Sequence, residues 1–267
     1  MFKRLLMKLF ISPPFGNYNK LSRFINYQIK SQVIPILGSY TIYPKTGLLH
    51  RAVRTVRFDR RRGGWVNKIG LRNDGILAGL NRYRANVGAG ARMESVLSVG
   101  ITDPESIPLL IHMIPSDVNL ELNISCPNMK DNLFTKLKPR ALISNGIGEF
   151  ASQYQDQKKR WCILKLPHNV MIRDVHQLYD VGFRQFHCSN TKPTVSGGLS
   201  GPELRQTNLN TIEEIDRRFF GDVEIIGGGG IQTIQHIDQY RWAGASHVSI
   251  STVLANPFRS YGLLYRL

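Results

Sequence analysis

Short stretches in which apolar and polar residues alternate recur along the chain, and longer amphipathic stretches separate most of them. The alternating segments predict strands near residues 7–12, 33–38, 95–100, 119–124, 161–166, 184–188, 223–227 and 246–250. Eight strands with helices between them predict an α/β fold, a parallel (β/α)8 barrel that forms a single domain over residues 1–267. An open, doubly wound sheet is the alternative.

Three helix starts are indicated by capping residues. Thr102 with Glu105 and Thr211 with Glu214 have the spacing of a capping box, and Thr233 precedes a third amphipathic stretch. We therefore expect one helix that ends near residue 115, one that begins at Thr211 and stops at Gly221, and one that begins at Thr233.

Composition narrows the class of protein. An apolar content of 42% is ample for a core, and three scattered cysteines are too few for a disulfide framework or a zinc knuckle, so no metal site is predicted. No apolar run approaches the ~18 residues that cross a bilayer. The basic N-terminus merges directly into the first strand, which favours no targeting segment. A reducing, cytoplasmic location without membrane insertion is the simplest interpretation.

The charge is strongly positive: 35 Lys and Arg against 19 Asp and Glu give a net charge of +16. Such an excess attracts anionic partners, among them nucleic acid, acidic lipid and small phosphorylated or carboxylate ligands. The basic runs 60–62 and 158–160 fall in expected loops and lack interleaved aromatic residues that would stack on bases. We therefore expect no specific nucleic-acid binding.

The segment 121–128, ELNISCPN, places a thiol at the carboxyl end of a predicted strand. Pro127 ends the strand, and Cys126 lies between the amide side chains of Asn123 and Asn128. A cysteine there can act as a base on a substrate that the asparagines hold. The alternative is a buried structural cysteine in a turn.

Other strand ends also carry polar or glycine-rich segments. Lys165 lies between two leucines, either to stabilise a developing anion or as a rim lysine whose ammonium reaches solvent. The glycine runs 197–201 and 227–230, with the Ser251-Thr252 pair, suit a phosphate, because glycine lets backbone N–H groups approach closely. The last two loops of such barrels commonly bind phosphate.

Taken together, these motifs resemble dihydroorotate dehydrogenases. ELNISCPN, Lys165, the Ser-Asn-Thr of 189–191, GGLSG and the later motifs occur in that family's order, from about residue 9 to residue 254. Segment 38–45 resembles the family's second-strand motif, and 66–75 resembles its substrate loop. The resemblance implies an FMN enzyme that oxidises dihydroorotate to orotate in pyrimidine biosynthesis. Cysteine at the base position resembles the soluble class.

The resemblance also implies residue roles. Cys126 would remove the C5 proton, and Lys165 would stabilise the reduced flavin. The substrate would be bound by Asn67, Asn123, Asn128, Asn190 and Thr191. The cofactor would be bound by Gly38, Ser39, Asn123, Lys165, Asn190, Ser200, Gly201, Gly229, Gly230, Ser251 and Thr252.

Two features depart from the family pattern. Gly38 stands where the soluble class often has a second lysine that contacts the flavin, and the loop after Asn128 lacks an expected Pro-Gly.

The alternative functions are those of a flavoenzyme like the tRNA-dihydrouridine synthases and of a flavin-binding protein that is inactive or acts on another pyrimidine. Ser125, where those synthases have glycine, argues against the first of these. The sequence leaves open the electron acceptor, which could be fumarate, NAD through a partner subunit or another oxidant. It also leaves open the oligomeric state, with a homodimer as one possibility.

Overall fold

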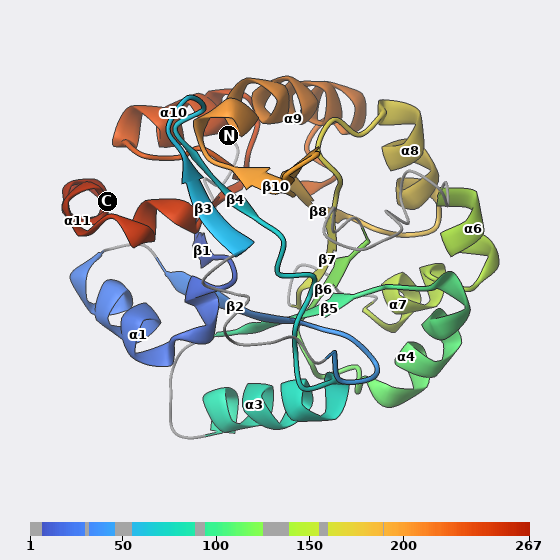
Figure 1. Ribbon diagram of the computed structural model, residues 1–267. Coiled ribbons are helices and arrows are strands. Elements are labelled where there is room, and N and C mark those ends of the chain that lie inside the picture. The colour runs from blue at the N-terminus through green and yellow to red at the C-terminus, as the bar shows by residue number, and fades with distance from the viewer. Residues whose placement is uncertain are drawn as a thin grey trace.

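A closed barrel of eight parallel strands forms the centre of the protein (Figure 1). The structure, a computed structural model, describes residues 7–29, 32–45, 55–88, 94–124, 139–154, 160–188 and 190–267. Around the barrel the strands follow the order β1-β12-β11-β8-β7-β6-β5-β2. They are β1 (Leu9–Ile11), β2 (Val33–Tyr40), β5 (Val96–Gly100), β6 (Leu120–Asn123), β7 (Cys162–Lys165), β8 (Gln185–Cys188), β11 (Glu224–Gly228) and β12 (His247–Ile250). The predicted barrel and all eight predicted strands are confirmed, and the open sheet was the wrong alternative.

Helices surround the barrel and cover the outer faces of its strands (Figure 1). The α-helices are α1 (Asn19–Gln28), α3 (Ile76–Gly88), α4 (Ile107–Met113), α6 (Pro139–Ser144), α7 (Gly148–Gln153), α8 (Ile172–Asp180), α9 (Arg205–Phe219), α10 (Ile234–Trp242) and α11 (Pro257–Leu264). Short 3-10 turns are η1 (Phe15–Asn17), η2 (Pro104–Ser106), η3 (Pro202–Leu204) and η4 (Thr252–Ala255).

One of the three predicted helix starts is confirmed as stated. Thr233 is the N-cap of α10, and its side chain accepts a hydrogen bond from the backbone N–H of His236. The start at Thr102 was off by one residue, because Asp103 caps η2 by accepting from the N–H of Glu105. The chain then continues into α4, which ends at Met113 as expected.

The predicted start at Thr211 was wrong. Helix α9 begins six residues earlier, at Arg205, and the Thr211 hydroxyl donates to the carbonyl of Thr207 inside the helix. The first turns are polar, and one of their residues, Asn208, is buried because it donates to the carbonyl of Gly228 at 2.8 Å. A periodicity of apolar residues cannot reveal a turn whose buried face is an amide.

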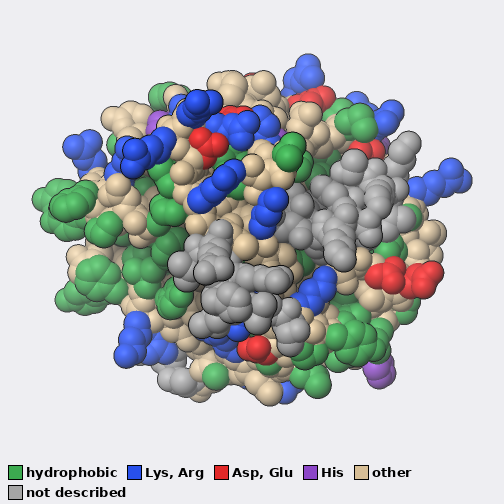
Figure 2. Space-filling view, in the orientation of Figure 1, with side chains coloured by type: hydrophobic (Ala, Val, Ile, Leu, Met, Phe, Trp, Pro, Cys, Tyr) green, Lys and Arg blue, Asp and Glu red, His purple; other side chains and the backbone are tan. Residues whose placement is uncertain are grey.

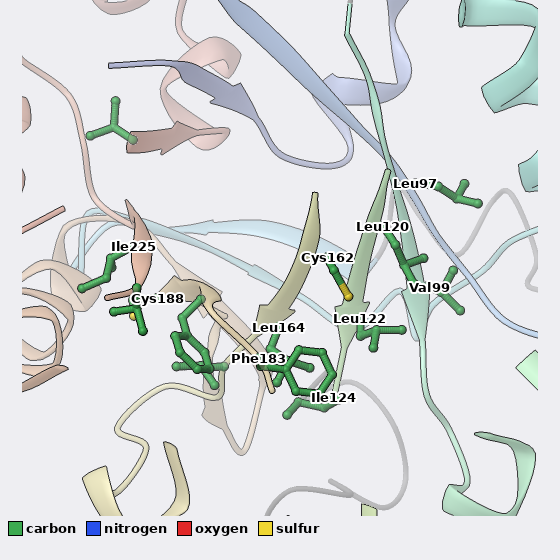
Figure 3. Close-up of a cluster of buried hydrophobic side chains, with 14 of the residues drawn as sticks. Leu97, Val99, Leu120, Leu122, Ile124, Cys162, Leu164, Phe183, Cys188 and Ile225 are labelled. Atoms are coloured by element: carbon green, nitrogen blue, oxygen red, sulfur yellow. The ribbon is translucent and has the colours of Figure 1, made fainter. Parts of the chain in front are cut away.

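Alternation along the barrel strands separates two hydrophobic layers. One face of each strand packs against the helices, and Figure 3 shows Leu97, Leu122, Leu164 and other buried side chains of this layer. The opposite faces form a smaller cluster: Phe10, Ile34, Ile36, Val96, Trp161, Ile163 and Ile226. Because side chains on a strand point alternately to its two faces, this second cluster fills the barrel interior.

A small antiparallel sheet lies over the carboxyl ends of the barrel strands. Its strands follow the order β3 (Val56–Asp59), β4 (Gly64–Asn67), β10 (Gly197–Ser200) and β9 (Lys192–Thr194). The basic residues 60–62 form the turn between β3 and β4, as expected for a loop. Strands β3 and β4 follow barrel strand β2, whereas β9 and β10 follow β8, so the sheet joins two distant parts of the chain.

Candidate active site

A cavity of about 480 Å³ opens between the barrel mouth and the small sheet. This volume falls in the range of small-molecule and cofactor sites, ~300–1,000 Å³. All predicted site residues that the structure describes line it: Gly38, Ser39, Asn67, Asn123, Lys165, Asn190, Thr191, Ser200, Gly201, Gly229, Gly230, Ser251 and Thr252. Cys126 and Asn128 lie outside the described residues.

A chain of hydrogen bonds joins the amides on one side of the cavity. The Asn190 side chain donates to Asn123 Oδ1 at 3.1 Å, and Asn123 donates to the Ser39 hydroxyl at 3.2 Å. Ser39 and Ser98 share a hydrogen bond of 2.8 Å. Asn123 is 4% and Asn190 is 7% exposed, so both amides are held in fixed orientations at the cavity wall. Such a wall presents donors and acceptors to a polar ring without burying net charge.

The backbone geometry at Gly38 leaves no room for the side chain of a lysine. Its φ is +122°, and a Cβ there would lie 2.5 Å from the carbonyl oxygen of Ser98. The register of β2 against β5 shifts between Gly38 and Tyr40, and the Asn17 amide both donates to and accepts from the Gly38 backbone. Any side chain at this position would collide with the neighbouring strand.

Glycines at two strand ends form a backbone cradle on another wall of the cavity. Gly201, Gly229 and Gly230 have φ values of +127°, +92° and +72°, conformations that L side chains rarely adopt. A Cβ on Gly230 would lie 2.9 Å from the carbonyl oxygen of Gly201. Helix α10 begins shortly after this turn. This arrangement suits a phosphate group, because the bare backbone and the helix N-terminus both favour an anion.

A buried carboxylate lies behind the cavity wall. Glu121 on β6 is 0% exposed, and its Oε2 lies 2.7 Å from His187 Nδ1. Its Oε1 accepts a hydrogen bond of 2.8 Å from Ser98 and lies 4.0 Å from Lys165 Nζ. Lys165 and His187 line the cavity, whereas Glu121 does not. The Lys165 side chain is only 11% exposed and faces this carboxylate, which does not fit the alternative of a rim lysine whose ammonium reaches solvent.

The surroundings of Glu121 and His187 fix their charge states. Burial by itself raises the pKa of Glu121, but the Lys165 ammonium and the hydrogen bond from His187 outweigh it and lower the pKa to about 2. Burial lowers the pKa of His187 despite its hydrogen bond to Glu121. At neutral pH the pair therefore consists of an ionised carboxylate and a neutral imidazole that donates from Nδ1.

These shifts predict that acid destabilises the fold. A histidine that is buried in its neutral form contributes fully to the stability of the fold above the pKa that it has in the unfolded chain, near 6.5. This contribution is lost as the pH falls below that value. Glu121 loses its contribution lower, between about pH 4.5 and 2. We expect His187→Gln to weaken the fall in unfolding temperature between pH 7 and 5, measured by thermal denaturation. Exposed His112 on α4 provides the control, since His112→Gln should keep the wild-type slope. Equal slopes for wild type and His187→Gln would contradict the prediction.

Sequence reasoning missed Ser98, Glu121 and His187 as parts of the site. The alternation at 119–124 could have indicated Glu121, because Leu120, Leu122 and Ile124 all face the helices. Glu121 and Asn123 therefore face the barrel interior together. A charged residue on an inward face requires buried partners.

Comparison with known families now agrees with the geometry. A family profile described as dihydroorotate dehydrogenase matches residues 21–261, which is most of the chain. The chain belongs to the dihydroorotate dehydrogenase family. The family name describes an oxidoreductase.

Several relatives and solved structures are similar to this family member. Proteins named dihydroorotate dehydrogenase B (NAD(+)), catalytic subunit, from Bacillus mycoides (strain KBAB4) and Bacillus cereus (strain AH187) are each 26% identical over 249 residues. Each match covers 84% of this chain and 77% of the relative. The ligand-free dihydroorotate dehydrogenase of Eimeria tenella has a TM-score of 0.75 at 17% identity, covering 96% of this chain and 82% of that one. At that identity the likeness concerns the fold alone.

The surface carries the excess of basic residues that the composition predicts. Figure 2 shows Lys and Arg side chains spread over the face that the small sheet occupies, with fewer Asp and Glu. Some of these charges are paired, since Glu203 contacts both Arg62 and Lys192.

Among the described residues, no helix is long and apolar enough to cross a membrane, and no cluster of side chains suits a metal ion.

Proposed function

We propose that this protein is an FMN-dependent dihydroorotate dehydrogenase, built as a single barrel domain, that oxidises dihydroorotate to orotate. The observation that carries the proposal is the convergence of the predicted residues. Segments that lie far apart in the sequence, from Gly38 to Thr252, contribute them to one cavity in a member of this family. The glycine cradle fits the phosphate of FMN, and the amide wall fits a pyrimidine ring.

The chain's own residues would divide the work as follows. Ser200, Gly201, Gly229, Gly230, Ser251 and Thr252 would hold the phosphate. Asn67, Asn123, Asn128, Asn190 and Thr191 would orient the substrate ring and carboxylate. Bound FMN would supply the acceptor for the hydride that leaves C6 of the substrate. Gly38 and Ser39 would support the ring from the β2 side, where Ser39 accepts the hydrogen bond of Asn123.

Two side chains would carry the charge and the proton. Cys126 would take the C5 proton of the substrate, since a thiol with an ordinary pKa near 8.5 is partly ionised at neutral pH. The Lys165 ammonium would stabilise the negative charge that accumulates in the cavity on reduction. Cys188, at the end of β8, is unsuited to the role of base because burial raises its pKa to about 12.

Anaerobic addition of dihydroorotate to the purified, yellow protein tests the proposal. We expect rapid bleaching of the flavin absorbance, followed by its return when an oxidant is supplied. The relatives are named NAD(+) catalytic subunits, so NAD+ together with a partner subunit is the first acceptor to try. A colourless protein that refuses FMN would refute the proposal. Reoxidation by unmodified tRNA, with none by orotate, would favour a dihydrouridine synthase instead.

A further inference from the structure

The ammonium of Lys165 has a buried counter-ion, Glu121, which does not itself line the cavity. Glu121 projects into the barrel interior from β6, and its carboxylate contacts side chains of three other strands. Ser98 comes from β5, Lys165 from β7 and His187 from β8. Because the barrel fixes these strands relative to one another, their side chains hold the Glu121 carboxylate in place.

The two carboxylate oxygens have separate partners. Oε2 accepts from His187, and Oε1 accepts from Ser98 while it faces Lys165. Ser98 in turn is bonded to Ser39, which accepts from Asn123 in the amide wall. The ion pair and the substrate wall are therefore parts of one hydrogen-bonded network.

We propose that Glu121, held by His187 and Ser98, is a positioning residue that places the Lys165 ammonium and sets the electrostatic potential at the cavity floor. The proposal rests on the proposed function, since the potential acts on a bound flavin. Among the described residues that line the cavity, no side chain is a carboxylate. Glu121 thus supplies a negative charge close behind the wall, where Coulomb interactions are weakly screened.

The sign of the effect follows from the charges. The charges of Lys165 and Glu121 offset each other, so neutralising Glu121 makes the floor more positive by one charge. A more positive floor favours a reduced, negatively charged flavin. Neutralising Glu121 should therefore increase the affinity for reduced FMN relative to oxidised FMN, and removing Lys165 should have the opposite effect.

Amine labelling of the apoprotein tests the contact without any cofactor. We expect Glu121→Gln to raise the rate at which acetic anhydride acetylates Lys165 several-fold, followed by peptide mass spectrometry, because the carboxylate no longer holds the ammonium. Glu224→Gln is the matched control. Like Glu121, Glu224 is a carboxylate near a buried histidine, and it accepts a hydrogen bond from Gln185. It lies at the amino end of β11, away from the cavity. Equal labelling of Lys165 in wild type and Glu121→Gln would overturn the proposal.

The second measurement is the ratio of the affinities for reduced and oxidised FMN, obtained from the midpoint potential of the bound flavin. We expect this ratio to rise about tenfold in Glu121→Gln, which equals ~30 mV for a two-electron couple. Glu224→Gln should leave it unchanged. If Glu121→Gln does not fold, the double variant Glu121→Gln/His187→Gln replaces the pair by two amides and should give the same rise.

An unchanged or lower ratio would overturn the proposed effect on the flavin. A wild-type protein that takes no FMN would instead refute the proposed function. The labelling experiment would still decide whether Glu121 holds Lys165, so the two failures are distinguishable.

Discussion

Replacing Cys126 by alanine should leave FMN bound while slowing the oxidation of dihydroorotate by about 10²–10⁴-fold at neutral pH, the usual effect of removing a general base. The C5 proton would then have no acceptor beside the asparagines. Cys126→Ser should keep some activity that increases with pH, because a hydroxyl is a poorer base. Anaerobic stopped-flow measurement of flavin reduction reports this step directly.

Cys162 provides the control for this prediction. It is a buried thiol at the start of β7, packed near the carbonyl of Phe150 and remote from the strand ends that line the cavity. Cys162→Ala should reduce stability slightly and leave flavin reduction unchanged. A Cys126→Ala variant that reduced its flavin at the wild-type rate would show that another residue takes the proton.

Replacing Lys165 by alanine should weaken FMN binding and slow flavin reduction by about 10²–10³-fold, the range for removal of one group that stabilises developing negative charge. The variant should also be less stable. Glu121 would remain buried without its cation, and breaking a buried pair on one side costs roughly 3–5 kcal/mol. Lys165→Arg should not restore function, since guanidinium is larger and planar.

Lys8 is the matched control for Lys165. It too is partly buried and paired with a carboxylate, with 3.3 Å between Lys8 Nζ and Glu94, but it precedes β1 at the amino end of the barrel. Lys8→Ala should bind and reduce FMN normally. Normal FMN occupancy and reduction in Lys165→Ala would show that the lysine has no part in the chemistry.

The sequence predicted the barrel well because its strands have strong alternation and clear ends. Leu120, Leu122 and Ile124 illustrate this, since one side of the segment is apolar and the other is polar. The start of α9 could not be predicted, because its first turns are buried through the amide of Asn208 rather than through apolar residues.

The candidate site was predicted through motifs, and its electrostatics were not. Lys165 was recognised as unusual from its apolar neighbours, yet its counter-ion lies 44 positions away in the sequence and meets it only through the pairing of β6 with β7. Likewise, Gly38 appeared as a missing lysine, whereas the structure shows a backbone that admits no side chain there. A local sequence pattern shows neither which distant strands pair nor where a neighbouring strand leaves no room for a side chain.

The small sheet over the cavity has a consequence for how the protein folds. Strand β4 pairs with β10, so Asn67 lies opposite Gly198 across more than a hundred intervening residues. Closing so long a loop costs entropy that only later contacts recover, and such pairings form late. During synthesis the roof of the cavity cannot form until β10 has left the ribosome.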